Sequence, residues 1–455
     1  MITRRNALAT IAAPLIAGKT AAQTSARPNF VFILVDDLRW DSLGCTGLSW
    51  MKTPHIDRIA HEGITFRNAF VTTPLCSPAR GSFLTGHYVH HHGVKGNGDS
   101  NALSHQLITF PALLQKAGYD TGFIGKWHMG NDATPRPGMR RWVSFKGQGQ
   151  YNDPPLNIDG KEVVAKGYVT DILSSHGADF VREKRDKPFC LYLAHKAIHG
   201  PFQPAERHKD LFKTEPLPAR PNMSYDRAGK TALLRPVEDN RKAGAPAPPS
   251  SRPHEEIARD QLRCMASVDD GVGEIIKALE ETKQLDNTVF VFTSDNGYFW
   301  GEHGLGDKRW AYEESIRIPL LVRYPPLVGK GVKSDAMVLN IDIAPTFLHL
   351  ARVEVPHGMH GRSFKEPMRG NRRTWRTSFV IEYFAEPNYP RTPTWNGLRT
   401  TRYKYIRYPE LPGADEMYDL VKDPYEKKNI AADTAAKPTR DRLKKELDQA
   451  LVRTA

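Results

Sequence analysis

Short apolar runs alternate with longer amphipathic stretches along most of the chain, and the two patterns predict different elements. Runs rich in β-branched and aromatic residues predict strands at Asn29–Val35, Thr121–Ile124, Phe189–Ala194, Thr288–Thr293 and Ile318–Arg323. The longer stretches predict helices at Pro54–His61, Phe110–Ala117, Thr170–Lys184, Glu255–Thr282 and Ile341–Ala351. This alternation is typical of an α/β fold with a mainly parallel sheet covered on both faces. The first run is apolar on both faces, as a central parallel strand requires.

The pattern changes after about residue 365. Alternating runs predict strands at Phe379–Tyr383, Trp395–Thr400 and Lys404–Tyr408, followed by a polar helix at Thr439–Val452. We therefore expect a catalytic domain over residues 23–365 and a small α+β C-terminal subdomain over 366–455. Between residues 201 and 253 prolines interrupt regular structure, and the stretch Ala243–Pro253 predicts a flexible loop.

The first 22 residues have the three parts of an export signal. Arg4 and Arg5 precede an apolar run from Ala7 to Gly18, and the small residues Ala21 and Ala22 follow. The Arg-Arg pair and its neighbours also resemble a twin-arginine signal. The alternative is a frayed amphipathic N-terminus. We expect an exported protein, periplasmic or secreted, with no membrane span, because no later segment resembles one.

Composition narrows the class of partner. The chain has 455 residues, 40% of them hydrophobic, which is enough for a sizeable core, and a formal net charge of +13. This charge suits an anionic partner such as a nucleic acid, an acidic lipid or a sulfated sugar. No basic–aromatic repeat or zinc-finger spacing is present in the sequence, so we expect no nucleic-acid partner. The four cysteines, Cys45, Cys76, Cys190 and Cys264, are too few for a disulfide scaffold, although one disulfide remains open.

Polar residues that can carry chemistry follow four of the predicted strands. Ligands bind at the carboxyl ends of parallel strands, so these segments are expected to converge on one site. The segments are Asp36-Asp37, Gly125-Lys126-Trp127-His128, His195-Lys196 with His199, and Ser294-Asp295-Asn296-Gly297. The oxygen donors of Asp36, Asp37, Asp295 and Asn296 suit a hard cation, calcium or magnesium. The alternative for each pair is a strand-end turn with one side chain capping the next helix.

The segment Cys76-Ser77-Pro78-Ala79-Arg80 predicts the start of a helix, because proline suits the first helical turn. Cys76 then lies at a helix N-terminus, where backbone N–H groups favour an anion. Arg80 lies about one turn further and can contact the same anion. Two other interpretations stay open: a buried cysteine before an ordinary helix, and a low-pKa thiolate.

This segment, continued by Gly-Ser-Phe-Leu-Thr-Gly, resembles the C-x-P-x-R signature of the type I sulfatases. The Asp36-Asp37 pair, the GKWH and SDNG blocks and the tail Met417-Tyr418-Asp419-Leu420 resemble the same family, in the same order. The resemblance implies an alkaline phosphatase-like α/β sandwich with a small C-terminal sheet. It also implies that a formylglycine-generating maturation enzyme oxidises Cys76 to formylglycine before or during export.

The resemblance further implies a role for each matching residue. Asp36, Asp37, Asp295, Asn296 and the modified Cys76 would hold Ca2+, with Mg2+ as the alternative. One hydroxyl of hydrated formylglycine would attack sulfur, and the other would release sulfate by re-forming the aldehyde. Arg80, Lys126 and His128 would support the hydrate, with His128 taking the proton, while His199 and Lys308 would grip the sulfate and assist the leaving oxygen. Both histidines are expected to exchange protons near neutral pH.

The stretch Trp142–Gly149, with Asn157-Ile-Asp-Gly160, resembles sulfatases that act on N-acetylglucosamine 6-sulfate and related polysaccharide units. We therefore expect a sulfated carbohydrate substrate. The alternatives are a small-molecule arylsulfatase, a phosphonate or phosphate monoester hydrolase of the same superfamily, and a polysaccharide-binding protein whose Cys76 stays unmodified.

Several other residues have two interpretations. The tract His90-His91-His92 is expected to be a polar loop rather than a metal site. His303 either lines the pocket or lies in an ordinary loop. The aromatic residues can stack on a sugar or simply pack in the core: Trp300, Trp310, Tyr312 and Trp395.

Overall fold

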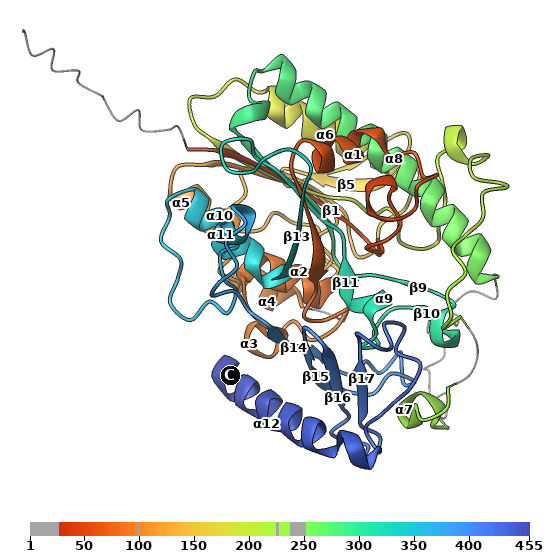
Figure 1. The fold of residues 1–455 in the computed structure, drawn as a ribbon. Coiled ribbons are helices and arrows are strands. Elements are labelled where there is room, and N and C mark those ends of the chain that lie inside the picture. Colours follow the sequence, from red (N-terminus) through yellow and green to blue (C-terminus); the bar gives the residue numbers. More distant parts are fainter. Residues whose placement is uncertain (1–26, 99, 224–226, 237–251) are drawn as a thin grey trace, which may run out of the picture.

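A large, mainly parallel sheet lies at the centre of the molecule (Figure 1). The computed structural model describes residues 27–98, 100–223, 227–236 and 252–455. The predicted export signal and most of the predicted loop Ala243–Pro253 lie outside these residues. Within them, eleven strands form the central sheet in the order β11-β2-β12-β8-β1-β7-β3-β4-β5-β6, with β13 beside β2.

The strands that carry the predicted polar segments are neighbours in this sheet. β1 pairs in parallel with β7 on one side and β8 on the other, and β7 pairs in parallel with β3. β11, β12, β5 and β6 pair antiparallel with their neighbours, on either side of this parallel centre. The bounds are β1 Asn29–Val35, β2 Ile64–Phe70, β3 Asp120–Gly125, β4 Arg141–Ser144, β5 Pro155–Ile158, β6 Lys161–Val164, β7 Phe189–Ala194, β8 Thr288–Ser294, β11 Arg317–Ile318, β12 Leu320–Arg323 and β13 Val332–Leu339; a separate pair is β9 Phe299–Trp300 and β10 Gly306–Asp307.

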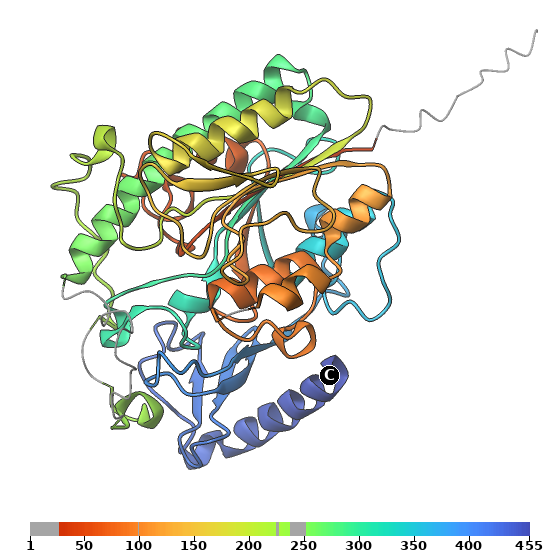
Figure 2. The same cartoon turned by 180° about the vertical axis from the view of Figure 1, so that it is seen from behind.

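Helices cover both faces of the sheet (Figures 1 and 2). Val31, Ile33 and Val35 of β1 pack in one cluster with side chains of α1, α6 and α8. The alternate residues of β1 pack on the other face with α2, α5 and α10. The bounds are α1 Pro54–His61, α2 Cys76–Thr85, α3 Val89–His92, α4 Asn101–Gln106, α5 Phe110–Lys116, α6 Val169–Arg182, α7 Thr231–Leu234, α8 His254–Glu281, α9 Glu313–Ile316, α10 Ile343–Leu350 and α11 Lys365–Met368. The predicted doubly covered α/β sheet is therefore confirmed.

The C-terminal part forms a small antiparallel sheet backed by one long helix, at the bottom of Figure 1. Its elements are β14 Ser378–Tyr383, β15 Trp395–Thr400, β16 Tyr403–Arg407, β17 Glu416–Asp419 and α12 Lys437–Thr454. Leu443 and Leu447 of α12 pack into the same apolar cluster as Trp395 and Tyr405. The rings of Phe379 and Phe70, 5.0 Å apart, join this sheet to the central one. The predicted small α+β unit is confirmed, with β17 as a strand that the sequence pattern did not predict.

Several predicted ends are shifted by one or two residues, and two predicted elements differ from the structure in kind. The predicted strand Ile318–Arg323 is divided at Pro319 into β11 and β12, because proline has no N–H for the ladder. The predicted helix at Ile341–Ala351 begins instead as a 3-10 turn over Asn340–Asp342, and α10 starts at Ile343. No helix among the described residues is long and apolar enough to cross a membrane.

Candidate active site

The polar segments after β1, β3, β7 and β8 meet with the first turn of α2 at one edge of the central sheet. The backbone N–H of Asp37 donates to Asp295 Oδ1 at 3.1 Å, which joins the ends of β1 and β8. Cys76 Sγ lies 3.5 Å from Asp36 Oδ1, which brings the start of α2 to the same point. The predicted convergence of these segments is therefore present in the fold.

Three carboxylates form the centre of this cluster. Asp36, Asp37 and Asp295 each offer an oxygen within 4.8 Å of the others, and all three are buried. Asn296 donates through Nδ2 to Asp37 Oδ1 at 2.6 Å, while its buried Oδ1 has no hydrogen-bond partner among the described residues. A buried carbonyl oxygen without a partner is costly unless a ligand occupies it. This oxygen-rich donor set therefore fits a hard divalent cation, Ca2+ or Mg2+.

Three buried cations surround the carboxylates. Arg80 donates through Nε to Asp295 Oδ2 at 2.9 Å and pairs through Nη2 with Asp36 Oδ2 at 3.1 Å. Lys126 donates to Asp36, and Lys308 Nζ donates to Asp37 Oδ1 at 2.5 Å. The three positive groups balance the three carboxylates when all three are ionised. A divalent cation added to this neutral set gives it an excess positive charge, which favours an anionic substrate.

Burial and neighbouring charges set the protonation of the carboxylates. Burial alone would raise the pKa of Asp36, but Lys126, His199 and Arg80 hold it well below its usual range. Burial raises the pKa of Asp37 to about 7, against the opposing effect of Lys308. Burial and the charge of Asp36 also raise the pKa of Asp295. Like charges crowded in a buried site thus disfavour full ionisation until further positive charge arrives.

Cys76 is the first residue of α2 and is completely buried. Burial and the charge of Asp36 raise the pKa of its thiol well above the ordinary value, even though Lys308 and Lys126 oppose them. The interpretation of Cys76 as a low-pKa thiolate was therefore wrong, because desolvation outweighs the helix N-terminus. Without a bound metal ion, the encoded thiol at this position is therefore held in its neutral form.

His128 and His199 face the cluster from the segments after β3 and β7. The Oγ of Ser77 donates its one proton to the His128 carbonyl and lies 3.4 Å from His128 Nδ1. The Nδ1 of His199 lies 3.1 Å from the Gly200 carbonyl, and its Nε2 lies 3.8 Å from Asp37 Oδ2. Burial and Lys126 hold the pKa of both rings well below the ordinary value. Without substrate, both rings are therefore held in the neutral form, and proton exchange by the two histidines during the reaction stays a prediction.

A cleft of about 570 Å3 opens beside His128. Residues from three separate segments line it: Lys95, Gly96 and Asn97 after α3, Gly147 and Gln148 after β4, and Glu386, Asn388 and Tyr389 after β14. Glu386 accepts from Arg309 Nε at 2.8 Å and from the backbone N–H of Asn97 at 3.0 Å, so it ties the segments together. The sequence pattern gave no sign of the wall that residues after β14 form on this cleft.

Comparison with known proteins decides the family. The sulfatase family profile matches residues 28–353, and the profile of the N-sulphoglucosamine sulphohydrolase C-terminal region matches residues 301–453. This chain belongs to the sulfatase family. Enzymes of this family are sulfuric ester hydrolases that generally use formylglycine and a divalent metal. The acidic cluster of this sulfatase is the candidate site for the metal.

Named relatives of this sulfatase act on amino-sugar sulfates. An N-acetylglucosamine-6-O-sulfatase of Bacteroides thetaiotaomicron is 33% identical, over 90% of this chain and 83% of the relative. The N-acetylglucosamine-6-sulfatase of Homo sapiens is 34% identical, over 83% of this chain and 71% of the relative. A solved structure described as a complex with its substrate D-glucosamine-2-N,6-O-disulfate superposes with a TM-score of 0.85 and 32% identity, over 94% of this chain and 98% of that one.

The candidate sugar-stacking residues of the sulfatase lie in its core. Trp300 donates to Gln261 Oε1, Trp395 donates to the Arg309 carbonyl, and Tyr312 donates to Glu416. These three side chains and Trp310 are all buried, so they pack and do not face a sugar. His303 is also buried, with its ring stacked on that of Tyr312 at 4.1 Å, and does not line the cleft.

The histidine tract of the sulfatase was wrongly predicted to be a loop. Residues Val89–His92 form α3, a single helical turn. His92 is buried, and its Nε2 lies 3.0 Å from Ser82 Oγ. His90 Nδ1 lies 2.8 Å from Glu382 Oε2. Both side chains therefore fix α3 to neighbouring elements, and only His91 of the tract is exposed to solvent.

Proposed function

We propose that this sulfatase removes 6-O-sulfate from N-acetylglucosamine or N-sulfated glucosamine units of a sulfated carbohydrate. The observation that carries the proposal is the similarity to the glucosamine disulfate complex, which extends over nearly the whole of both chains at 32% identity. Two relatives named for N-acetylglucosamine 6-sulfate support the same position. The volume of the cleft beside His128 is in the range typical of small-ligand sites.

We further propose that residues 1–22 direct export to the periplasm or the exterior and are removed. Residues 23–365 then form the catalytic domain and residues 366–455 the C-terminal subdomain. Glu386, Asn388 and Tyr389 support a role for the subdomain in binding, because they line the cleft from the chain after β14.

Asp36, Asp37, Asp295 and Asn296 are the residues that would hold the metal, together with the modified Cys76. Calcium suits this set better than magnesium, because a crowded carboxylate-rich site does not impose strict octahedral geometry. When bound, the ion supplies positive charge that polarises the sulfate oxygens. Arg80, Lys126 and Lys308 add fixed charges in a buried site, where electrostatic stabilisation of the transition state is strongest.

Formylglycine at position 76 supplies the nucleophile. Because Cys76 is completely buried at the start of α2, the maturation enzyme can reach it only before this segment folds. This supports modification on an unfolded chain, before or during export. The same burial excludes bulk water from the reacting atoms.

His128 is proposed to act as the base through Nε2. A hydroxyl has one proton, and Ser77 uses it on the His128 carbonyl, so Ser77 Oγ can only accept from Nδ1. The Nδ1 position therefore carries the proton of the neutral ring, and Nε2 has the free lone pair. The low pKa of His128 keeps this lone pair available at neutral pH.

His199 and Lys308 are proposed to assist the departing sugar oxygen. A carbonyl only accepts, so the contact with Gly200 places a proton on His199 Nδ1 and makes Nε2 the atom that gains or loses a proton. The negative charge of a bound sulfate ester raises the pKa of this ring and favours its charged form. Lys308 Nζ donates a hydrogen bond to Asp37 Oδ1, and His199 Nε2 lies 3.8 Å from Asp37 Oδ2, so both side chains meet at the same carboxylate.

Replacing His199 with alanine is expected to slow the hydrolysis of sugar sulfates far more than that of activated aryl sulfates. A sugar alcohol is a poor leaving group that needs a proton, and general acid catalysis contributes about 10²–10⁴-fold. The ratio of kcat values for glucosamine 6-sulfate and 4-nitrophenyl sulfate, wild type against H199A, measures this difference. An equal loss on both substrates would contradict the role of His199 as the acid.

The proposed function is tested by sulfate release from a panel of saccharides sulfated at defined positions, with Cys76→Ala as the blank. We expect glucosamine 6-sulfates to give the highest kcat/KM, and 2-, 3- and 4-sulfated sugars to react much more slowly. Aryl phosphonate and aryl sulfate of the same phenol form a second arm of the panel. A preference for the phosphonate, or turnover of aryl sulfates with no saccharide hydrolysed, would overturn the proposal.

A further inference from the structure

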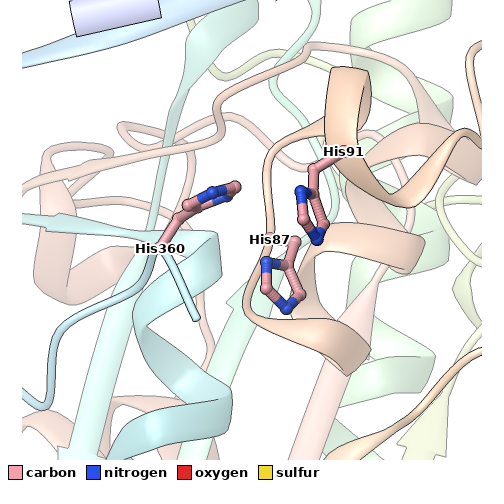
Figure 3. A group of neighbouring side chains, drawn as sticks. All are labelled: His87, His91 and His360. Carbon is pink, nitrogen blue, oxygen red and sulfur yellow. The ribbon is translucent and has the colours of Figure 1, made fainter. Parts of the chain in front are cut away.

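Three histidines outside the catalytic cluster gather at the opposite end of α2. His87 follows the C-cap residue Gly86 of this helix, and His91 lies one turn further in α3. His360 comes from the segment after α10 and faces both of them (Figure 3). Each ring offers one nitrogen, and the three nitrogens lie within 4.8 Å of one another.

We propose that His87, His91 and His360 bind a divalent transition-metal ion, with zinc as the ion that the site suits best. Imidazole nitrogens are preferred ligands of zinc, whereas the carboxylate cluster beside Cys76 suits calcium. Zinc–nitrogen bonds of about 2.0–2.1 Å need nitrogens about 3.4 Å apart, so small side-chain rotations complete the set. Zinc in proteins usually has four ligands, so three histidines leave one coordination position for water.

The three rings lie close together, and two of them are held in the neutral form that a metal requires. The ring centroids of His87 and His91 are 4.3 Å apart, and that of His360 lies 4.8 and 4.9 Å from them, edge-on to both. The Nδ1 of His87 is buried and has no hydrogen-bond partner among the described residues. Burial, together with the neighbouring histidines, lowers the pKa of His87 and that of His360 to about 4. Both rings are therefore neutral at pH 7 and keep a lone pair for a metal.

The backbone holds the two segments together beside the three rings. The N–H of Gly361 donates to the Gly86 carbonyl at 2.9 Å, next to both His360 and His87 in sequence. The N–H of Tyr88 donates to His360 Nδ1 at 3.2 Å, so the neutral ring carries its proton on Nε2. Zinc binding at Nε2 requires that proton to move to Nδ1, which exchanges one long hydrogen bond for a metal–nitrogen bond.

The helix itself favours a cation at this end. The ten residues of α2 place Cys76 at the N-terminus and the histidines just past the C-terminus, about 15 Å away. The C-terminal end of a helix carries partial negative charge, which stabilises a bound cation. The same helix would thus present its positive end to the sulfate and its negative end to zinc, and zinc would tie α2 to the segment that carries His360.

The test is zinc binding by protein prepared without a polyhistidine tag, stripped with chelator and then saturated with Ca2+ at the carboxylate cluster. Isothermal titration with Zn2+ is expected to show one site in the wild type. We expect affinity to fall at least about tenfold in His91→Ala and in His360→Gln, which remove one ligand from each segment. His357→Ala, which removes an exposed histidine three residues before His360, is the matched control and should bind like the wild type.

A second readout separates binding from folding. Zinc should raise the Tm of the wild type and of His357→Ala, because a ligand that binds only the native state stabilises it, and should leave His91→Ala unchanged. His91 is exposed, so its removal should not alter the Tm without zinc. The proposal is overturned if the wild type binds no zinc under these conditions, or if His91→Ala and His360→Gln bind it with wild-type affinity.

Discussion

Cys76→Ala is expected to lower kcat/KM for a sugar sulfate by at least about 10⁴-fold, because loss of a covalent nucleophile leaves only binding and electrostatic effects. The variant should fold normally, since alanine fits the buried first turn of α2 without a new polar group. Sulfate release at saturating Ca2+ measures the loss. Cys45→Ala is the matched control, because Cys45 lies in the 3-10 turn after β1 and away from the cluster. Retention of more than about a hundredth of the wild-type kcat/KM by Cys76→Ala would rule out a nucleophile at this position.

Asp295→Asn should have the second-largest effect. Asp295 accepts from Arg80 Nε at 2.9 Å and from the Asp37 N–H at 3.1 Å, and an asparagine keeps the shape but not the charge. We expect kcat/KM to fall by about 10²–10³-fold, because both metal binding and the placement of Arg80 are weakened. The Ca2+ concentration that gives half-maximal activity should rise in the same variant.

Asp269→Asn is the control for this change. Asp269 of α8 is also buried, and its Oδ1 accepts from the backbone N–H groups of His55 and Ile56 at 3.1 and 2.8 Å. An asparagine oxygen can accept the same bonds, so activity and calcium dependence should stay at the wild-type level. If Asp269→Asn lost as much activity as Asp295→Asn, the effect would reflect general damage to the fold and not the proposed metal site.

The centre of the site could be predicted because it depends on strand ends. β1 is apolar from Phe30 to Val35 and buried over its whole length, so its central place in the sheet follows from burial on both faces. The residues that come directly after β1 and β8 are then forced to the same edge of the sheet. The short distance between the Asp37 N–H and Asp295 Oδ1 is a consequence of that topology.

The cleft beside His128 could not be predicted in the same way. Its wall joins the segment after α3 to the segment after β14, and the contact between Asn97 and Glu386 spans 289 positions in sequence. Such contacts depend on how the C-terminal sheet packs against the central sheet. The hydrophobic pattern of a short stretch of sequence does not predict that packing. The aromatic residues illustrate the same limit, because residue type alone did not distinguish a buried Trp395 from a Tyr389 that lines the cleft.

The protonation states of Cys76 and the two histidines of the site also could not be predicted from the sequence. Residue types suggested a reactive thiol at a helix start and histidines that titrate near neutral pH. Burial reverses both, raising the pKa of Cys76 and lowering that of His128. Burial thus keeps the encoded thiol of Cys76 in its neutral form, and the chemical conversion of this residue is the central claim of the account.

Mass spectrometry of the peptide that contains Cys76, from active protein made in an export-competent host, tests this claim most directly. We predict the mass of formylglycine or its hydrate in place of cysteine, with a fraction of aldehyde that rises in proportion to specific activity across preparations. Fully active protein whose Cys76 is an unmodified cysteine would contradict the account.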